Sequence, residues 1–236
     1  MGICENQYSF VKKYGIDLLE INNKSMLELG DQILNSNQIF NGMKIAKHFY
    51  TKNGFNHTSI DWNGNNGSIK LDLTKPYPKF RNTFDIITNH GTSEHVHDQY
   101  SLFKNLHEWA KVGCIFVNCV PLDSEEHKKI MNYEFPPHGD FEYSSKFWEE
   151  LCKEQDYELI ISKGDLVRNP AVAFPINYYS ASTYRKVNNK PFMLKEKFEK
   201  LTKFIKKTSY RLSRNEHIKW FNSLPDEIKN KYPNIS

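Results

Sequence analysis

Residues 25–72 constrain the fold of this chain more than any other segment, because short apolar runs alternate there with turn residues. Strands are predicted over 25–30, 55–61 and 68–73. The first strand ends at Gly30, and the second and third reach the acids Asp61 and Asp72. An α/β sheet binds its ligands at the carboxyl ends of its strands. The sequence therefore predicts a ligand site where Glu28, Asp61, Asp72 and a glycine turn share one rim.

Carboxylates at this rim restrict the ligand that it can bind. They accept hydrogen bonds from ribose hydroxyls and from an adenine amine, and they attract an amino acid that carries a sulfonium, whereas they repel a pyrophosphate. The glycine-rich pattern typical of NAD sites does not follow the first strand. These residues favour S-adenosylmethionine (SAM) over NAD as the cofactor.

The rest of the chain continues the alternation of strands and helices. Further strands are predicted over 84–89, 114–120, 157–162 and 174–185. Helices are predicted within 4–22 and over 37–52, 98–111 and 145–154. This order predicts an α/β fold with a Rossmann-like, seven-stranded, mostly parallel sheet and helices on both faces. Residues 1–188 would form this domain, and 189–236 a basic helical extension packed on it, with Leu194, Phe198, Leu201 and Ile205 as its apolar stripe.

Composition limits the partners of the chain. Its 236 residues fit one domain with a small appendage, and a formal charge of +4 is too small to indicate nucleic acid. No run approaches the roughly 18 apolar residues of a membrane span, and the first ten residues do not form a signal peptide. We expect a cytoplasmic protein. The segment from Glu216 onwards packs either on the domain or on a second subunit, as in a homodimer.

A metal site is not expected. The four cysteines contain no C-x-x-C pair. His95, His97 and Asp98 resemble a ligand set, but they offer one acid among imidazoles, whereas Mg²⁺ prefers several carboxylate and water oxygens.

The order of motifs resembles the class I SAM-dependent methyltransferases of the small-molecule type. The resemblance covers residues 24–185, and it rests on six segments: 27–30, 60–61, 71–73, 84–87, 93–96 and 110–114. The last two, which read SEHV and AKVGC, are similar to signatures that flank the helix after the fourth strand in that family.

The resemblance implies a set of cofactor contacts. Glu28 and Gly30 would lie beside the methionine part of SAM, and Asp61 would accept hydrogen bonds from the ribose hydroxyls. Trp62 would pack against the adenine, and Asp72 would meet its amine. Gln32 and Asn89 complete the set of cofactor contacts, and Asn89 and His90 would border the transferred methyl group.

The first loop departs from the family pattern. Gln32 and Leu34 stand where the family has glycines, and the interval from Gly30 to Asp61 is longer than usual. Glycines there let the backbone approach a ligand closely. Two interpretations stay open: a remodelled loop that still binds SAM, or an inactive scaffold that partners another enzyme.

Three histidines are candidates for a general base. His90, His95 and His138 fall after the fourth and fifth strands, and histidine suits a base near neutral pH. The alternative for His95 is that it braces the following helix.

The sequence as a whole predicts a SAM-dependent methyltransferase that acts on a small-molecule acceptor. The methyl group would be transferred to a hydroxyl of a sugar or of another cell-surface or secondary-metabolite precursor. Asn-His-Gly-Thr over 89–92 replaces the Asn-Pro-Pro-Tyr type of motif, which argues against methylation of DNA bases or protein glutamine. An RNA methyltransferase anchored by the lysine-rich helix is the remaining alternative.

Overall fold

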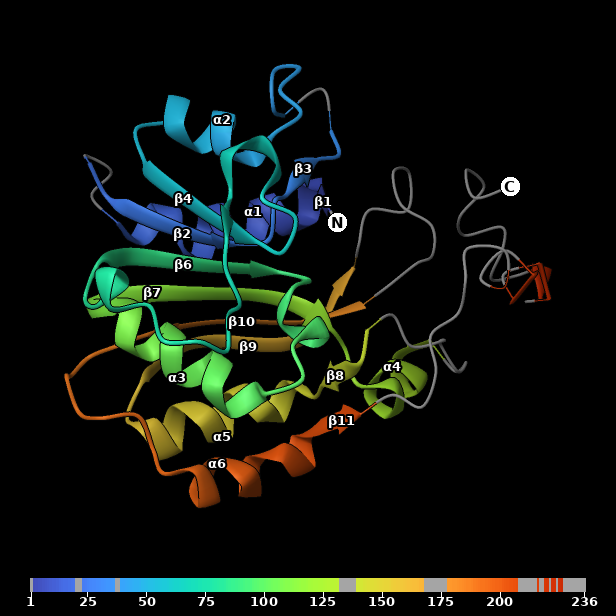
Figure 1. The fold of residues 1–236 in the computed structure, drawn as a ribbon. Helices are drawn as coiled ribbons and strands as arrows, with labels where there is room; N and C mark the ends of the chain where they lie inside the picture. The colour runs from blue at the N-terminus through green and yellow to red at the C-terminus, as the bar shows by residue number, and fades with distance from the viewer. Residues whose placement is uncertain are drawn as a thin grey trace.

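The computed structural model describes residues 2–19, 23–36, 39–131, 139–167 and 178–207, together with 216, 219–220, 222–223 and 225–226. Its centre is a seven-stranded sheet in the order β5-β4-β2-β6-β7-β10-β9 (Figure 1). The strands are β2 (Ser25–Leu29), β4 (Asn56–Asp61), β5 (Ile69–Lys70), β6 (Phe84–His90), β7 (Ala110–Pro121), β9 (Glu158–Val167) and β10 (Tyr178–Arg185). Neighbouring strands are parallel except where β10 pairs with β7 and β9. The predicted mostly parallel sheet is confirmed.

Helices cover both faces of the sheet (Figure 1). One face carries α1 (Glu5–Tyr14) and α2 (Ala46–Lys52), and the other carries α3 (Gln99–Trp109), α5 (Ser145–Gln155) and α6 (Lys195–Leu201). Side chains alternate along each strand. Met26 and Ile86 therefore belong to the core under α1 and α2, whereas Leu27 and Ile87 belong to the core under α3 and α5.

Shorter elements connect these layers. They are the helix α4 (Ser124–Met131) and the 3₁₀ turns η1 (Ile16–Leu18), η2 (Asn65–Gly67), η3 (Pro78–Phe80), η4 (Ser93–His95) and η5 (Thr202–Phe204). In the described part of the chain, no helix is long and apolar enough to cross a membrane.

The segment after β2 differs from its prediction. The helix expected over 37–52 begins only at Ala46, and residues 37–38 lie outside the described residues. Before it, β3 (Ile33–Leu34) pairs in parallel with β1 (Gly2–Ile3), and Ile33 also forms a bridge with Ile45. These pairings fix residues 33–34 and 45, and residues 39–42 form turns between them, which a local apolar pattern does not reveal.

The C-terminal segment is partly a strand. Phe198 and Leu201 of α6 are buried as expected, but Leu194 is 73% exposed at the N-cap. Ile205 lies in β11 (Ile205–Lys207), which pairs with β8 (Phe141–Tyr143), so the prediction of one helical stripe through Ile205 is wrong. The strand pairing satisfies the backbone beyond the short helix.

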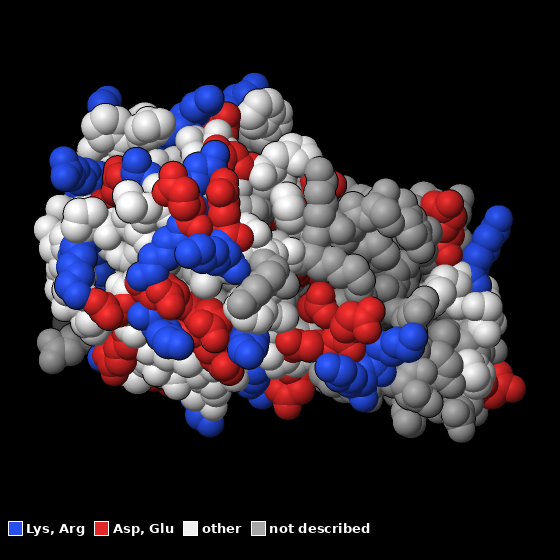
Figure 2. Space-filling model, turned by 90° about the horizontal axis from the view of Figure 1, so that it is seen from below, with Lys and Arg blue, Asp and Glu red and all other residues white. Residues whose placement is uncertain are grey.

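Among the described residues of this segment, two lysines lie beside acids. Lys197 pairs with Glu154 at 2.7 Å, and Lys195 lies 3.9 Å from Glu199. Seen from below the view of Figure 1, acidic and basic side chains are interspersed (Figure 2). An extended basic patch would be needed to follow a phosphate backbone.

Candidate functional site

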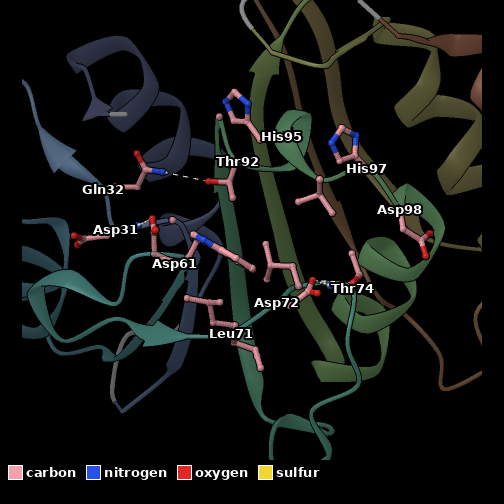
Figure 3. A pocket seen from close by; sticks show the side chains of 16 residues that line it. Asp31, Gln32, Asp61, Leu71, Asp72, Thr74, Thr92, His95, His97 and Asp98 are labelled. Atoms are coloured by element: carbon pink, nitrogen blue, oxygen red, sulfur yellow. Dashed lines mark hydrogen bonds between the residues drawn. The ribbon is translucent and has the colours of Figure 1, made fainter.

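A cavity of about 650 Å³ opens at the carboxyl ends of β2, β4, β5 and β6 (Figure 3). It is lined by Gly30, Asp31, Gln32, Ile60, Asp61, Trp62, Leu71, Asp72, Leu73, Thr74, Gly91, Thr92, His95, Val96, His97 and Asp98. Asp31 and Asp61 lie on one side of it, and His97 and Asp98 lie on the opposite side. Six of the residues predicted from the sequence come together here: Gly30, Gln32, Asp61, Trp62, Asp72 and His95.

The turn at Gly30 requires glycine. Its φ is +86°, a conformation that L side chains rarely adopt. A Cβ would lie 2.6 Å from Gln32 Nε2 and 2.7 Å from Thr92 Oγ1. The amide of Gly30 donates to the carbonyl of Ile60 at 2.7 Å, which ties the turn to the end of β4.

Asp61 is held at the end of β4 by two backbone amides. Its Oδ2 accepts from the amide of Asp31 at 2.8 Å, and its Oδ1 accepts from the amide of Asn63 at 2.9 Å. Asn66 Nδ2 in turn donates to Asp31 Oδ2 at 2.7 Å. A carboxylate offers about four acceptor sites, so both oxygens of Asp61 retain capacity for a ligand hydroxyl.

Two further carboxylates keep the cavity anionic. Asp72 Oδ1 accepts from the amide and the hydroxyl of Thr74, and these hydrogen bonds lower the pKa of Asp72. Burial opposes ionisation of Asp98, but the hydrogen bonds from Ser101 outweigh it and lower its pKa. None of the described residues that line the cavity is a lysine or an arginine. The site therefore attracts cations and hydrogen-bond donors, and it disfavours phosphates.

Trp62 presents an aromatic ring at the mouth of the cavity. It lines the cavity and is 74% exposed, although large aromatic side chains are usually buried. Such a ring offers a face on which a planar group can stack.

Gln32 fills the place of the second family glycine. Its side chain is buried, and its Nε2 donates to the carbonyls of Leu29 and His90, each at 3.1 Å. Figure 3 shows Gln32 and Thr92 directed towards one another, at 3.5 Å. Thr92 Oγ1 donates to the same Leu29 carbonyl at 2.9 Å.

Glu28 lies within β2 and is not among the lining residues. It is 1% exposed, and its Oε2 lies 3.4 Å from Nε2 of the buried His57. Burial raises the pKa of Glu28, and His57 partly offsets this effect.

Asn89 also lies beneath the lining. Its Nδ2 donates to Ser93 Oγ at 2.8 Å and to Asn118 Oδ1 at 3.3 Å, while its Oδ1 accepts from the amides of Thr92 and Ser93. Asn89 thus orders the turn that contributes Gly91 and Thr92 to the cavity.

The three candidate bases occupy different places. His95 lines the cavity, with 30% of its side chain exposed and its Nε2 3.7 Å from Glu94 Oε1. His90 is 2% exposed and does not line the cavity, and burial lowers its pKa to about 4. His138 lies outside the described residues. Within the described structure, His95 is the predicted base that a ligand can reach.

Sequence reasoning missed several lining residues. Asp31 directly follows the Gly30 turn, and Thr92 follows the break after β6, so both occupy positions where strand ends meet. Asp98 was recognisable as a helix N-cap, and its side chain accepts from the amide of Ser101 at 3.0 Å. His97 also lines the cavity, but its position after the fourth strand was recognisable only as part of a metal-like set with His95 and Asp98.

Comparison with known proteins supports the fold. No family model and no curated protein matches the sequence. The solved structure of 1,6-didemethyltoxoflavin-N1-methyltransferase from Burkholderia thailandensis matches with a TM-score of 0.53 and 12% identity, over 78% of this chain and 79% of that one. That structure holds S-adenosylhomocysteine.

Two further solved structures give the same result. A SAM-dependent methyltransferase from Methanosarcina mazei matches with a TM-score of 0.51 and 13% identity, over 80% of this chain and 100% of that one. Geranyl diphosphate C-methyltransferase from Streptomyces coelicolor A3(2) matches with a TM-score of 0.50 and 10% identity, over 76% and 81%. The chain has the class I SAM-dependent methyltransferase fold, as its sequence predicts.

Proposed function

We propose that this protein is a SAM-dependent methyltransferase for a small-molecule acceptor. The observation that carries the proposal is the cavity at the strand ends, which has carboxylates on its walls and no lysine or arginine among its described lining residues. SAM combines hydroxyls, an adenine amine and a sulfonium, and each of these groups is favoured beside carboxylates. The fold supports the same cofactor, because the toxoflavin enzyme was solved with S-adenosylhomocysteine.

In this proposal the adenosine part of SAM would lie on the side of the cavity formed by β4 and β5. Asp61 would accept the ribose hydroxyls with the acceptor capacity that the loop amides leave. Asp72, fixed by Thr74, would accept from the adenine amine, and Trp62 would stack on the ring. When bound, SAM supplies an electrophilic methyl group on its sulfonium.

His95 is the residue that we propose for activating the acceptor. A neutral imidazole that lines the cavity can take a proton from a hydroxyl as that oxygen becomes the nucleophile. Glu94, adjacent to the ring, would stabilise the imidazolium that results. We therefore propose an O-acceptor, such as the hydroxyl of a sugar or of another cell-surface or secondary-metabolite precursor. His138, which lies outside the described residues, is a second candidate from the sequence.

An RNA acceptor is less well supported. Lys195 lies beside Glu199 within α6 and Lys197 pairs with Glu154 of α5, so these lysines would bind a phosphate backbone only weakly. The inactive-scaffold alternative has one supporting observation, the side chain of Gln32 at a position where the family has glycine.

The test is a transfer assay with SAM labelled on its methyl group and a panel of sugars and other hydroxyl compounds. Labelled product from at least one acceptor, lost in His95→Gln and kept in His48→Gln, is the expected result. His48 is an exposed histidine on α2 and serves as the matched control. SAM binding without transfer to any acceptor would favour the scaffold alternative, and no binding would remove the proposal.

A further inference from the structure

The amide of Gln32 bridges the ends of two adjacent strands inside the cavity. Leu29 ends β2 and His90 ends β6, and these strands are parallel neighbours in the sheet. A primary amide has two N–H donors. In Gln32 these reach one carbonyl each, both at 3.1 Å. Two carbonyl oxygens therefore converge on one nitrogen at the rim.

This arrangement leaves the other end of the amide unsatisfied. Gln32 is 2% exposed, and its Oε1 has no hydrogen-bond partner among the described residues. A buried acceptor without a donor is costly. The side chain is therefore only half satisfied as a structural bridge: its nitrogen bonds both carbonyls, although that of Leu29 also accepts from Thr92 Oγ1 at 2.9 Å, and its oxygen bonds none of the described residues.

The same position is where the amino-acid end of the cofactor would arrive. The proposed ribose partner, Asp61, bonds the amide of Asp31, which is the residue before Gln32. Apart from its adenine amine, the N–H donors of SAM are those of its α-ammonium group. An ammonium with three N–H groups would satisfy the carbonyls of Leu29 and His90 as the amide does.

We propose that the Gln32 side chain is a built-in competitor for the α-ammonium group of the cofactor. The amino-acid part of SAM then binds only after this side chain turns away from the two carbonyls. The inference rests on the proposed function, because it takes an adenosine-linked amino acid as the ligand.

The backbone around Gln32 shows which part can move. The carbonyl of Gln32 accepts from the amide of Ala46, the first residue of α2, at 3.0 Å. Gly30 is tied in the same way to Ile60. Both ends of the turn are therefore fixed, and release of the carbonyls requires rotation of the side chain alone.

Comparing two ligands shows how much the amino-acid part of the cofactor contributes to binding. S-adenosylhomocysteine carries the α-ammonium, whereas 5′-methylthioadenosine has the same adenosine and thioether without the amino acid. In the wild-type protein, we expect 5′-methylthioadenosine to bind at least as tightly as S-adenosylhomocysteine, because only the latter must displace Gln32. Calorimetric titration of both ligands measures this directly.

Removing the side chain provides the matched comparison. Gln32→Ala should raise the affinity for S-adenosylhomocysteine about tenfold, which corresponds to two ordinary hydrogen bonds no longer displaced, and leave that for 5′-methylthioadenosine unchanged. Gln32→Ser, which cannot reach both carbonyls, should give the same direction. The control Gln155→Ala removes a buried amide on α5, whose Nε2 donates to the carbonyl of Pro191, and should change neither affinity.

Three results would overturn the inference. The first is that the wild type binds S-adenosylhomocysteine more tightly than 5′-methylthioadenosine. The second is that Gln32→Ala binds S-adenosylhomocysteine more weakly than the wild type does, which would make Gln32 a cofactor contact. The third is an equal change for both ligands, which would show an effect on the whole cavity. Absence of binding by either ligand, in wild type and variants alike, would instead refute the proposed function on which the inference rests.

Discussion

Replacing His90 by leucine should make the protein less sensitive to acid. The imidazole lies at the end of β6 with 2% exposure, and neither of its nitrogens has a hydrogen-bond partner among the described residues. Burial alone lowers its pKa to about 4. The folded protein therefore holds His90 neutral, whereas the unfolded chain protonates it near its ordinary pKa.

The sign and size of the effect follow from this difference. Because the folded pKa lies below the unfolded value of about 6.5, the unfolded state binds more protons between pH 6.5 and 4, so stability is complete above this window and is lost as the pH falls through it. At pH 5 the unfolded histidine is almost fully protonated and the folded one only slightly, which costs about 2 kcal/mol relative to pH 7.5.

The assay is urea unfolding of wild type and His90→Leu at pH 7.5 and pH 5. The loss of unfolding free energy between the two conditions should be about 2 kcal/mol smaller in the variant. His107 lies in the same window, because burial lowers its pKa to about 4 as well, and it keeps part of the acid sensitivity in both proteins. His48→Leu, on the exposed face of α2, should parallel the wild type. Equal acid losses in wild type and His90→Leu would refute the burial argument.

Three further outcomes are expected. Asp61→Ala should weaken SAM binding by about 1–3 kcal/mol in calorimetry through lost ribose hydrogen bonds, while the exposed Asp165→Ala leaves it unchanged; equal affinities would place the cofactor elsewhere. His95→Gln should keep the SAM affinity and slow methyl transfer about 10²–10⁴-fold at saturating SAM, and loss of SAM binding instead would make its role structural. Lys186→Met should lower the unfolding free energy by about 1–3 kcal/mol, because the buried Nζ donates to the carbonyls of His107 and Ala110 at the end of α3, and an unchanged urea midpoint would contradict this.

The main sheet was predictable because its strands are local features. Each is a short apolar run that ends at a turn residue, as at Gly30 and Asp61, and the strand ends also located most of the cavity. The pairing of β1 with β3 was not predictable, since it joins residues about thirty positions apart and leaves the local pattern of 33–34 unremarkable. Long-range pairing of this kind overrides local propensity.

The remaining differences between the predictions and the structure also arise from strand pairing and strand geometry. Ile205 continues the helical spacing from Phe198 and Leu201, and it is buried as that spacing predicts, but its backbone pairs with β8 instead. Within the site, alternation along β2 sends Glu28 to the same face as Met26, towards α1 and α2. Residue type alone indicated three carboxylates at one rim, whereas strand periodicity separates the buried Glu28 from Asp61 and Asp72, which line the cavity.

The most direct measurement is calorimetric titration of the purified protein with SAM and with S-adenosylhomocysteine, with ATP as the anionic comparison. The acidic cavity predicts saturable 1:1 binding of both sulfur compounds and no binding of ATP, since no lysine or arginine is present among the described lining residues to hold phosphates. Absence of binding by both sulfur compounds, or tighter binding of ATP, would contradict the proposal that this cavity is a SAM site.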